Sequence, residues 1–436
     1  MRLHARVGEA LLGLHGPDDP EHVLELAQHW WVAVPVTGPG AALPHVLAAA
    51  DHAMARLAYE QAEQQLRRAL ELLGSMPPSA ERTRRELGIQ VRLGNLLGQL
   101  GSPGAPEAAA AFARAAELAA EAADDPAAVP ALAGVHAGYT MRADHQQARA
   151  LAERVLDGAQ RSGDPQALLA GHFLLGHTLC LQGELVAARD HLEEAVRLAA
   201  ALPEAAQLPG TPLVLSANGL LEIVLVLLGR HDQATKVAEA ASRDIQRSHH
   251  PYPKAVAMAI GVFAAVHRRD LPLVRARAAA AAALAERWGF QMLAATATAP
   301  LGWAQAIEGA PAGGAALLRQ ALARSQATGT QATRPLLLGL LAEAEQLAGR
   351  PGEALRLLDD GLAQVDRSGE RYCEAELHRL KGESLLAGSP PRAAEAEAAF
   401  RTSIAVARRQ GAKLLEERAA ASLGRLLAAQ RSQSSR

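Results

Sequence analysis

A spaced set of small and large apolar residues recurs along the chain and constrains its fold more than any other feature. In residues 173–196, FLLGHTLCLQGELVAARDHLEEAV, Gly176 is followed 12, 16 and 19 residues later by Ala188, Leu192 and Ala195. The short segment QGE divides the stretch into two amphipathic halves. This arrangement predicts a pair of helices that approach closely where the small residues lie.

The same spacing returns at intervals of roughly 40 residues, a period typical of helical repeat arrays. Unchanged copies are Ala50–Ala62–Leu66–Ala69, Gly302–Gly314–Leu318–Ala321 and Ala342–Ala354–Leu358–Gly361, and stretched copies are Gly94–Ala108–Phe112–Ala115 and Gly382–Ala396–Phe400–Ser403. One helix pair cannot bury both of its apolar stripes, so neighbouring pairs must stack into a continuous core. The pattern predicts an all-α fold, an α-solenoid of about nine tetratricopeptide-like helix pairs in a right-handed superhelix, followed by a last helix over 414–430.

Composition agrees with an all-helical chain. Of the 436 residues 49% are hydrophobic but only 3% are aromatic, and such Ala- and Leu-rich chains favour close-packed helices. A formal net charge of -2 gives no basic field, so we expect no direct binding of nucleic acid. The most apolar run, GLLEIVLVLLG, is too short to span a bilayer and contains Glu222. With no signal peptide at the N-terminus, we expect a soluble, cytoplasmic chain without membrane contact.

Several phrases resemble one known family. PEHVLELAQHWWVA followed by AAADHAMARLAYEQAEQQLRRALELL is similar to the junction after the ATPase in large bacterial signal-transduction ATPases of the STAND type. The phrases HHPYPKAVAMAIGVFAAVHRRD, ATGTQATRPLLLGLLAEAEQLAGR and RRQGAKLLEERAAASLGRLL resemble later parts of the same tetratricopeptide array. The chain thus resembles the C-terminal region of adenylate/guanylate cyclase-associated and LuxR-like transcriptional-regulator ATPases.

The resemblance implies a division of the chain and a role. Residues 1–40 would be a helical cap, the remnant of a winged-helix segment, residues 41–430 the array, and residues 431–436 a disordered tail. In the family the array is the sensor and regulatory module of the ATPase. This chain departs from the family because it contains no G-x-x-x-x-G-K-[ST] loop, the phosphate-binding signature of the ATPase.

No catalytic, cofactor or metal signature accompanies the repeat, so we expect no enzyme, no cofactor and no metal. The motifs H-E-x-x-H, G-x-S-x-G and C-x-x-C are absent. His15, His22 and His29 are spaced by seven, but GPDDP breaks the helix after His15. Only the other two could share a face, too far apart for one metal without further ligands. His249 and His250 are adjacent in a loop, and adjacent side chains point apart.

Apolar surroundings predict that the remaining aromatic and thiol side chains are buried. These are Cys180, Cys373, Trp288, Phe290 and Trp303, with Trp30 and Trp31 closing the N-terminal end of the core. Two distant cysteines in a chain of this length do not indicate a disulfide framework.

The first helix of each tetratricopeptide pair lines a concave groove, so polar and aromatic residues on first helices are candidate partner contacts. The candidates are Asn218, Glu222, Arg334, Glu343, Tyr372, His378 and Arg379. The densest stretch, GERYCEAELHRLKGE, is interpreted as a helix beginning near Arg371. A solvated helix face with i,i+4 charge pairs is the alternative interpretation of that stretch.

Together these features predict a non-catalytic tetratricopeptide binding and regulatory module of a bacterial signalling or transcription-regulating ATPase system. Its groove would hold a protein or peptide partner. A sensor of a small-molecule inducer is one alternative. An oligomerisation scaffold, with WWVAVPV as a candidate apolar patch, is another. An enzyme with Glu343 and Glu374 as acid–base carboxylates is the third.

Overall fold

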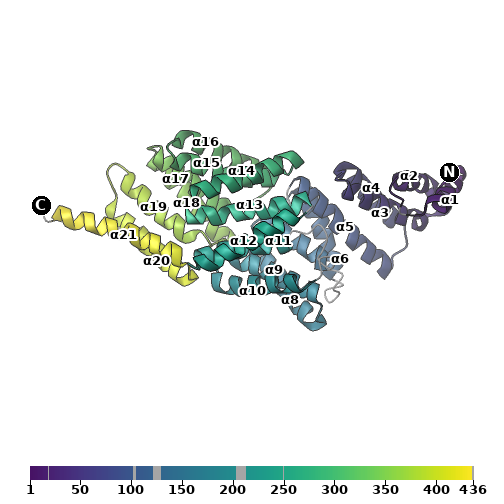
Figure 1. The fold of residues 1–436 in the computed structure, drawn as a ribbon, viewed down its shortest axis with the longest axis horizontal. Helices are drawn as coiled ribbons and strands as arrows, with labels where there is room; N and C mark the ends of the chain where they lie inside the picture. Colours follow the sequence, from purple (N-terminus) through teal and green to yellow (C-terminus); the bar gives the residue numbers. More distant parts are fainter. Residues whose placement is uncertain (18, 102–104, 121–128, 203–212, 249, 435–436) are drawn as a thin grey trace. The chain divides into compact units, whose positions relative to one another are not determined.

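Helices make up every regular element in the part of the chain that the structure describes. The computed structural model describes residues 1–17, 19–101, 105–120, 129–202, 213–248 and 250–434, and within them it has 21 α-helices and no strand (Figure 1). No helix in these ranges is long and apolar enough to cross a membrane. His249 of the His249–His250 pair and residues 435–436 of the predicted tail lie outside the described residues.

From α3 onward the helices follow one another as nine helix–turn–helix pairs. The pairs are α3 (Pro39–Ala55) and α4 (Tyr59–Gly74), α5 (Ala80–Leu100) and α6 (Pro106–Ala120), α7 (Val129–Met141) and α8 (His145–Ser162), α9 (Pro165–Leu181) and α10 (Leu185–Ala201), α11 (Leu213–Leu227) and α12 (His231–Arg247), α13 (Pro251–Arg268) and α14 (Leu271–Trp288), α15 (Gln291–Ile307) and α16 (Pro311–Ala327), α17 (Arg334–Leu347) and α18 (Pro351–Ser368), and α19 (Glu374–Ala387) and α20 (Ala393–Gln410). Two helices precede them, α1 (Arg2–His15) and α2 (Val23–Thr37), and α21 (Lys413–Ser434) follows. The all-α array of tetratricopeptide-like pairs is therefore confirmed. The last helix extends beyond residue 430, where the prediction placed its end.

Turn residues explain where the helices stop and start. Helix α8 ends at Gly163, which has φ 68°, a conformation that glycine adopts at little cost. The next residue, Asp164, caps α9 by accepting a hydrogen bond from the Ala167 backbone N–H at 2.7 Å. Pro165 then occupies the first turn of α9, where its missing N–H costs nothing.

The spacing between small and large apolar residues has a direct steric cause. A Cβ added to Gly176 would lie 2.8 Å from Leu192 Cγ, and one added to Gly382 would lie 2.5 Å from Phe400 Cε1. The side chain 16 or 18 residues downstream therefore occupies the space that the glycine leaves on the first helix. Leu192 and Phe400 are fully buried as a result, so the repeat signature marks the crossing point within each pair.

The buried thiols and aromatic residues largely match the prediction. Those confirmed as buried are Cys180, Cys373, Trp30, Phe290 and Trp303. Trp288 and Trp31 are only half-buried, and each lies beside an arginine side chain, with guanidinium-to-ring distances of 5.8 Å and 5.1 Å. Both rings are covered in part by a charged neighbour, so they do not reach the core.

The chain divides into two compact units. Unit 1 comprises Met1–Gln99 and Ala105–Gly138, and unit 2 comprises Leu100–Gly104 and Tyr139–Arg436. In unit 1, α1 packs on α2 and α2 packs on α3. Trp30 of α2 links them, because its ring stacks on His45 of α3 at 5.1 Å and lies against α1 at Gly8. Residue 40, the predicted end of the cap, lies in α3, and the division into cap and array stays a prediction.

Within unit 2, backbone hydrogen bonds connect helices that are five pairs apart in the sequence. At the end of α7 the carbonyl of Met141 accepts hydrogen bonds from the N–H of Gln331, at 2.7 Å, and from the next N–H, at 3.1 Å, just before α17. At the end of α9 the carbonyl of Leu181 accepts from Arg371, at 2.7 Å, and from the next N–H, at 3.2 Å, just before α19. Helix α11 likewise contacts α21, five pairs later (Figure 1). We call the two carbonyl contacts the return joints; they bring the first helices of distant pairs together.

Candidate functional site

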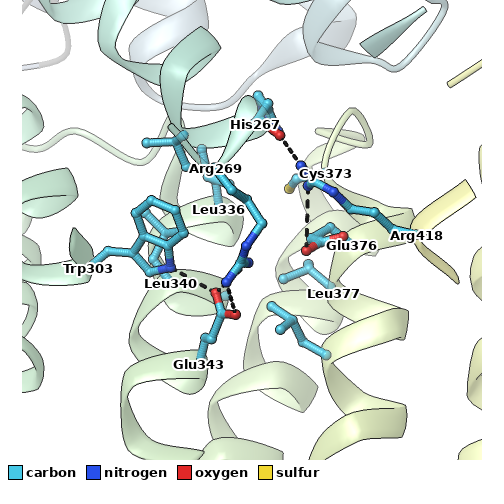
Figure 2. Close-up of a pocket in the computed structure, with 13 residues that line it drawn as sticks. His267, Arg269, Trp303, Leu336, Leu340, Glu343, Cys373, Glu376, Leu377 and Arg418 are labelled. Carbon is cyan, nitrogen blue, oxygen red and sulfur yellow. Dashed lines mark hydrogen bonds and ion pairs between the residues drawn. The ribbon is translucent and has the colours of Figure 1, made fainter. Parts of the chain in front are cut away.

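Helices of unit 2 converge on a small, partly open cavity. Its lining comes from α13, α15, α17, α19, α21 and the residues adjoining them (Figure 2). The residues that carry its chemistry are His267, Arg269, Trp303, Glu343, Glu376 and Arg418. The cavity volume is about 20 Å³, room for about one water molecule. In this state it can hold a water or a small ion, but no peptide.

One side of the cavity is organised around the carboxylate of Glu343 on α17. Arg269 donates to both of its oxygens, at 2.8 and 3.2 Å, and the indole N–H of Trp303 donates to one of them at 2.8 Å. The Arg269 guanidinium also lies 5.2 Å from the centre of the Trp303 ring, a favourable cation–π contact. Arg269 follows α13 with φ 58°, so a strained backbone position supports this cluster.

The other side is organised around the carboxylate of Glu376 on α19. Arg379 donates to both of its oxygens, at 2.7 and 3.0 Å. Burial alone would raise the pKa of Glu376, but the charge and hydrogen bonds of Arg379 lower that pKa to about 2. Arg418 reaches Glu376 only at 4.0 Å and donates to the carbonyl of His267. Burial lowers the pKa of Arg418, which identifies it as the least compensated cation of the cluster.

The titratable groups among the described lining residues are buried or paired. Burial and the neighbouring Arg418 lower the pKa of His267 to about 4, so its imidazole is neutral at pH 7. Burial raises the pKa of the Cys373 thiol well above its usual value, which keeps it protonated and weakly nucleophilic. Glu343 and Glu376 are both held in ion pairs, and Glu374, the other acid–base candidate, pairs with an arginine at 3.0 Å. The arrangement is suited to binding charged groups.

Three of the seven predicted groove residues belong to this cluster. Glu343 lines the cavity, and Arg379 binds the lining residue Glu376. The Tyr372 ring packs edge-on against His267 with 6.0 Å between ring centres. However, Tyr372 is 4% exposed and Arg379 is 9% exposed. In this state neither side chain is available to a partner.

The other four candidates lie elsewhere in unit 2. Asn218 is buried and donates to a carboxylate of α12 at 3.3 Å. Glu222 is also buried and pairs with Arg277 at 2.9 Å. Arg334 begins α17 and His378 lies on α19, each half-buried. None of the four lines the cavity.

The start of α19 differs from the prediction. The helix begins at Glu374, three residues later than expected, because the N–H groups of Arg371 and Tyr372 donate to the return joint at Leu181. Tyr372 and Glu374 are buried. The start of the stretch therefore packs in the interior, whereas Arg379 further along makes charge pairs at i,i+3 and i,i+4 spacing with Glu376 and Glu383.

Sequence reasoning missed Arg269, His267 and Arg418. A signal for Arg269 was present in VHRRD, since Asp270 caps α14 by accepting from the N–H of Leu273 at 3.1 Å. Arg269 is therefore the last residue before the N-cap of α14, where its side chain can turn inward. Arg418 carried no such signal, because its partner His267 lies 151 residues away.

Comparisons with known proteins identify no family for the chain. No family model matches it. An uncharacterized protein of Rhizobium meliloti (strain 1021) is 30% identical over 212 residues, which are 48% of this chain and 20% of that protein. The chain therefore matches only about a fifth of the length of this relative.

Solved structures of low similarity cover most of the chain. They include a Rap protein complexed with competence and sporulation factor (11% identity, 95% of this chain and 99% of that one, TM-score 0.46). A human IFIT1 dimer with m7Gppp-AAAA has 13% identity and a TM-score of 0.49. The match covers 96% of this chain and 88% of that one. A STAND protein with a tetratricopeptide repeat sensor from Pyrococcus horikoshii has 11% identity and a TM-score of 0.37. The match covers 93% of this chain and 68% of that one. At these values no ligand or activity can be transferred to this chain.

Proposed function

We propose that the chain is a non-catalytic, tetratricopeptide-like regulatory module of a bacterial signalling or transcription-regulating ATPase system, and that it binds a protein or peptide partner on the inner face of unit 2. One observation carries the proposal. Side chains on or beside four first helices, α13, α15, α17 and α19, and the last helix, α21, bring arginines, glutamates and an indole to one place. Arginine and aromatic anchors of this kind dominate binding energy at protein interfaces.

Binding on this face requires an opening of unit 2. A cavity of about 20 Å³ admits no peptide, and Tyr372 and Arg379 are buried. The structure would then be the unliganded, closed state, and a partner would bind the state in which α21 separates from α13. A partner can shift that equilibrium only by binding the two states with different affinity. Such a difference in affinity would let partner binding change the conformation of unit 2 and so regulate an ATPase linked to it.

The test compares two arginines of unit 2 that make similar ion pairs, one at the cavity and one away from it. Arg269 pairs with Glu343 at the cavity and its side chain is 34% exposed. Arg356 pairs with Glu353 on α18, which does not line the cavity, and its side chain is 59% exposed. A partner captured from the source bacterium with the full chain is identified by mass spectrometry, purified and titrated by calorimetry against Arg269→Gln and Arg356→Gln.

We expect Arg269→Gln to weaken binding by at least about tenfold, the typical effect of removing an interface anchor, and Arg356→Gln to leave it unchanged. Arg334→Glu, at the start of α17, tests whether the contact extends along the wider predicted groove. Equal affinity of Arg269→Gln and the wild type would place the partner elsewhere and refute the inner face as the site. Arg379 is unsuitable for charge reversal, because a reversed charge beside Glu376 would disrupt the fold.

A small-molecule inducer is the second candidate, favoured by the small size of the cavity around which the charged side chains gather. In that case a metabolite would raise the melting temperature of the wild-type chain, in a dose-dependent way, but not that of Arg269→Gln. No stabilising metabolite in such a screen, with a saturable protein partner present, would exclude the inducer.

A further inference from the structure

The turn between α1 and α2 in unit 1 brings together three potential metal ligands. His15 is the last residue of α1, Asp19 lies in the turn, and His22 is the N-cap of α2. Sequence reasoning expected the break after His15 to separate it from His22. The break has the opposite effect, because the chain turns back at Gly16 and stacks the two imidazole rings with 3.9 Å between their centres. We propose that His15, Asp19 and His22 bind one zinc ion.

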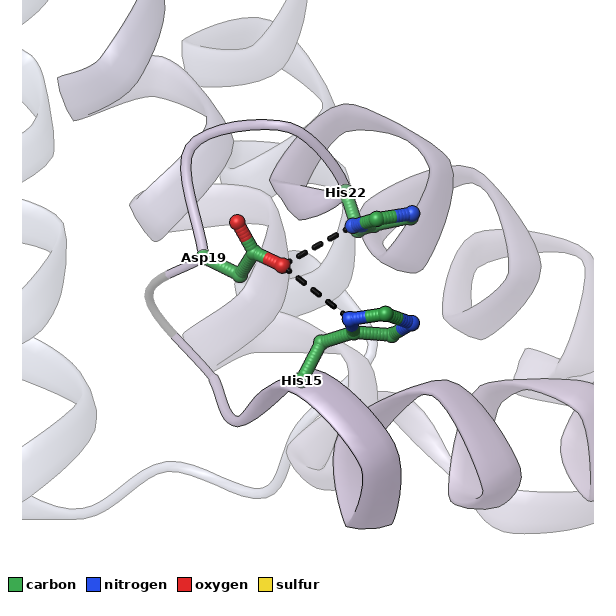
Figure 3. Close-up of side chains that lie close together, drawn as sticks. All are labelled: His15, Asp19 and His22. Carbon is green, nitrogen blue, oxygen red and sulfur yellow. Dashed lines mark hydrogen bonds and ion pairs between the residues drawn. The ribbon is translucent and has the colours of Figure 1, made fainter.

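The ligand atoms already face one another at distances close to those of a zinc site. Asp19 Oδ2 lies 3.3 Å from His15 Nδ1 and 2.9 Å from His22 Nδ1 (Figure 3). The three ligand atoms lie within 4.8 Å of one another. Tetrahedral zinc with bonds of about 2.0–2.1 Å separates its ligand atoms by about 3.3 Å. A small rotation of the side chains would complete the site.

Backbone hydrogen bonds hold Asp19 in place independently of the histidines. Its Oδ1 accepts from the N–H of Glu21 at 3.1 Å. Its carbonyl accepts from the N–H groups of His22 and Val23, at 3.1 and 2.9 Å. Oδ1 is thus engaged by a backbone N–H of the turn before α2, and Oδ2 is directed at the two rings. All three ligands fall within eight residues, so closing the site costs little chain entropy.

The chemistry of the three ligands favours zinc over calcium or magnesium. Two imidazole nitrogens and one carboxylate oxygen are borderline ligands that suit zinc, whereas calcium and magnesium prefer all-oxygen sites. The side chains of His15, Asp19 and His22 are 35%, 22% and 29% exposed. Solvent can therefore supply the fourth ligand, and the ion would join the end of α1 to the start of α2.

A second histidine pair in the same two helices provides a matched control. His4 and His29 lie with their Nδ1 atoms 2.9 Å apart. The carboxylate near them, Glu25, is 3.8 Å from the opposite nitrogen of His29, Nε2. A third ligand therefore does not converge on the two Nδ1 atoms of this pair. Substitution of His4 should not affect the site in the turn.

The experiment uses the full chain without a polyhistidine tag, freed of metal by a chelator. Zn²⁺ is titrated by calorimetry, and Co²⁺ binding is followed by its visible absorption spectrum, which reports coordination geometry. We expect one equivalent of Zn²⁺ and a tetrahedral Co²⁺ spectrum for the wild type and for His4→Ala. Circular dichroism checks that every variant keeps its helix content.

Loss of a ligand should weaken Zn²⁺ binding strongly. We expect the affinity for Zn²⁺ to fall more than about 100-fold in His15→Ala and in His22→Ala, since substitution of even the supporting residues of zinc sites changes affinity by about 10- to 100-fold. Asp19→Asn, which keeps the oxygen that accepts from the Glu21 N–H, should weaken binding by about tenfold or more. No saturable Zn²⁺ binding by the wild type would refute the site, as would full affinity in His15→Ala and His22→Ala. The site lies in unit 1 and does not depend on the proposed partner of unit 2.

Discussion

Histidines and carboxylates have contrasting surroundings in the two units. In the α1–α2 turn of unit 1, His15 and His22 are about one third exposed beside Asp19. In unit 2, His267 is 3% exposed beside the Glu376–Arg379 ion pair. Access of water explains the contrast. Exposed side chains keep free ligand atoms at little cost, whereas buried ones must satisfy one another and become part of the core. The two regions should therefore respond differently to the same kind of substitution.

Removal of a carboxylate should have the largest effect and should separate the units most clearly. In unit 2, Glu376→Ala leaves Arg379 and Arg418 without their shared counter-charge, which should lower the free energy of unfolding by about 3–5 kcal/mol. In unit 1, Glu81 pairs with Arg84 and Arg85 on an exposed face, and Glu81→Ala should change stability little. Denaturant unfolding measures both.

Glu376→Gln provides the control for that substitution, because it keeps the shape and one hydrogen-bond acceptor while removing the charge. Its free energy of unfolding should lie between those of the wild type and Glu376→Ala. Equal losses from Glu376→Ala and Glu81→Ala would contradict the contrast between the units.

Acid should destabilise unit 2 through His267 before it affects the ion pairs. Tyr372, Glu376 and Arg418 face this imidazole. Its pKa is about 4 in the folded chain, against about 6.5 when unfolded. Between these pH values the unfolded state binds more protons, so the free energy of unfolding falls as pH falls. The loss should be on the order of 3 kcal/mol by pH 4 and should not grow below it.

The comparison of wild type with His267→Gln isolates this contribution, measured by denaturant unfolding at several pH values. The variant should show a shallower loss between pH 6.5 and 4, even if it is less stable at pH 7. His177, whose pKa burial also lowers to about 4, titrates in both proteins and cancels. Parallel pH profiles would show that His267 is not the group responsible.

Glycine substitutions compare how tightly the helices of each unit cross. A Cβ on Gly314 in unit 2 would meet backbone atoms, the carbonyl of Gly302 at 2.3 Å and the N–H of Ala306 at 2.7 Å. A Cβ on Gly94 in unit 1 would meet side-chain atoms instead, the ring of Phe112 at 2.7 Å, and a side chain shifts at lower cost than backbone atoms of two packed helices. Overpacking costs about 1–3 kcal/mol, so we expect Gly314→Ala near the upper value and Gly94→Ala near the lower. Thermal unfolding that ranks them in reverse would contradict this account.

The substitution with the smallest expected effect should stabilise the fold. Gly424 lies in α21 with open space around the position of a Cβ. Gly424→Ala should raise the free energy of unfolding by about 0.5–1 kcal/mol, because alanine favours the helix and restricts the unfolded chain. A loss of stability would mean that this face of α21 is covered in solution.

The sequence predicted the helix pairs because their pattern is local. Gly176 and Leu192 meet across one turn, so spacing alone identified the contact. Glu343 was found as a polar residue on a first helix. Its partner Arg269 was not, because their contact depends on how far each helix pair rotates relative to the previous one. Small rotations summed over the two pairs from α13 to α17 leave no periodic mark in the sequence. The turn at His15 and His22 was misjudged for a related reason, since a helix break was taken to separate residues that a tight turn brings together.

The return joints have an evolutionary consequence. Open helical arrays gain and lose repeats freely, because each repeat touches only its neighbours. Between Leu181 and Arg371 that freedom is lost, since these residues bond only when the nine helices α10 to α18 lie between them. Duplication or deletion of one pair inside this interval would place a different turn opposite the carbonyl of α9 and leave its hydrogen bonds unmade. Relatives that share the return joints should therefore conserve the number of repeats in this interval even where their sequences have diverged, and length variation should accumulate outside it.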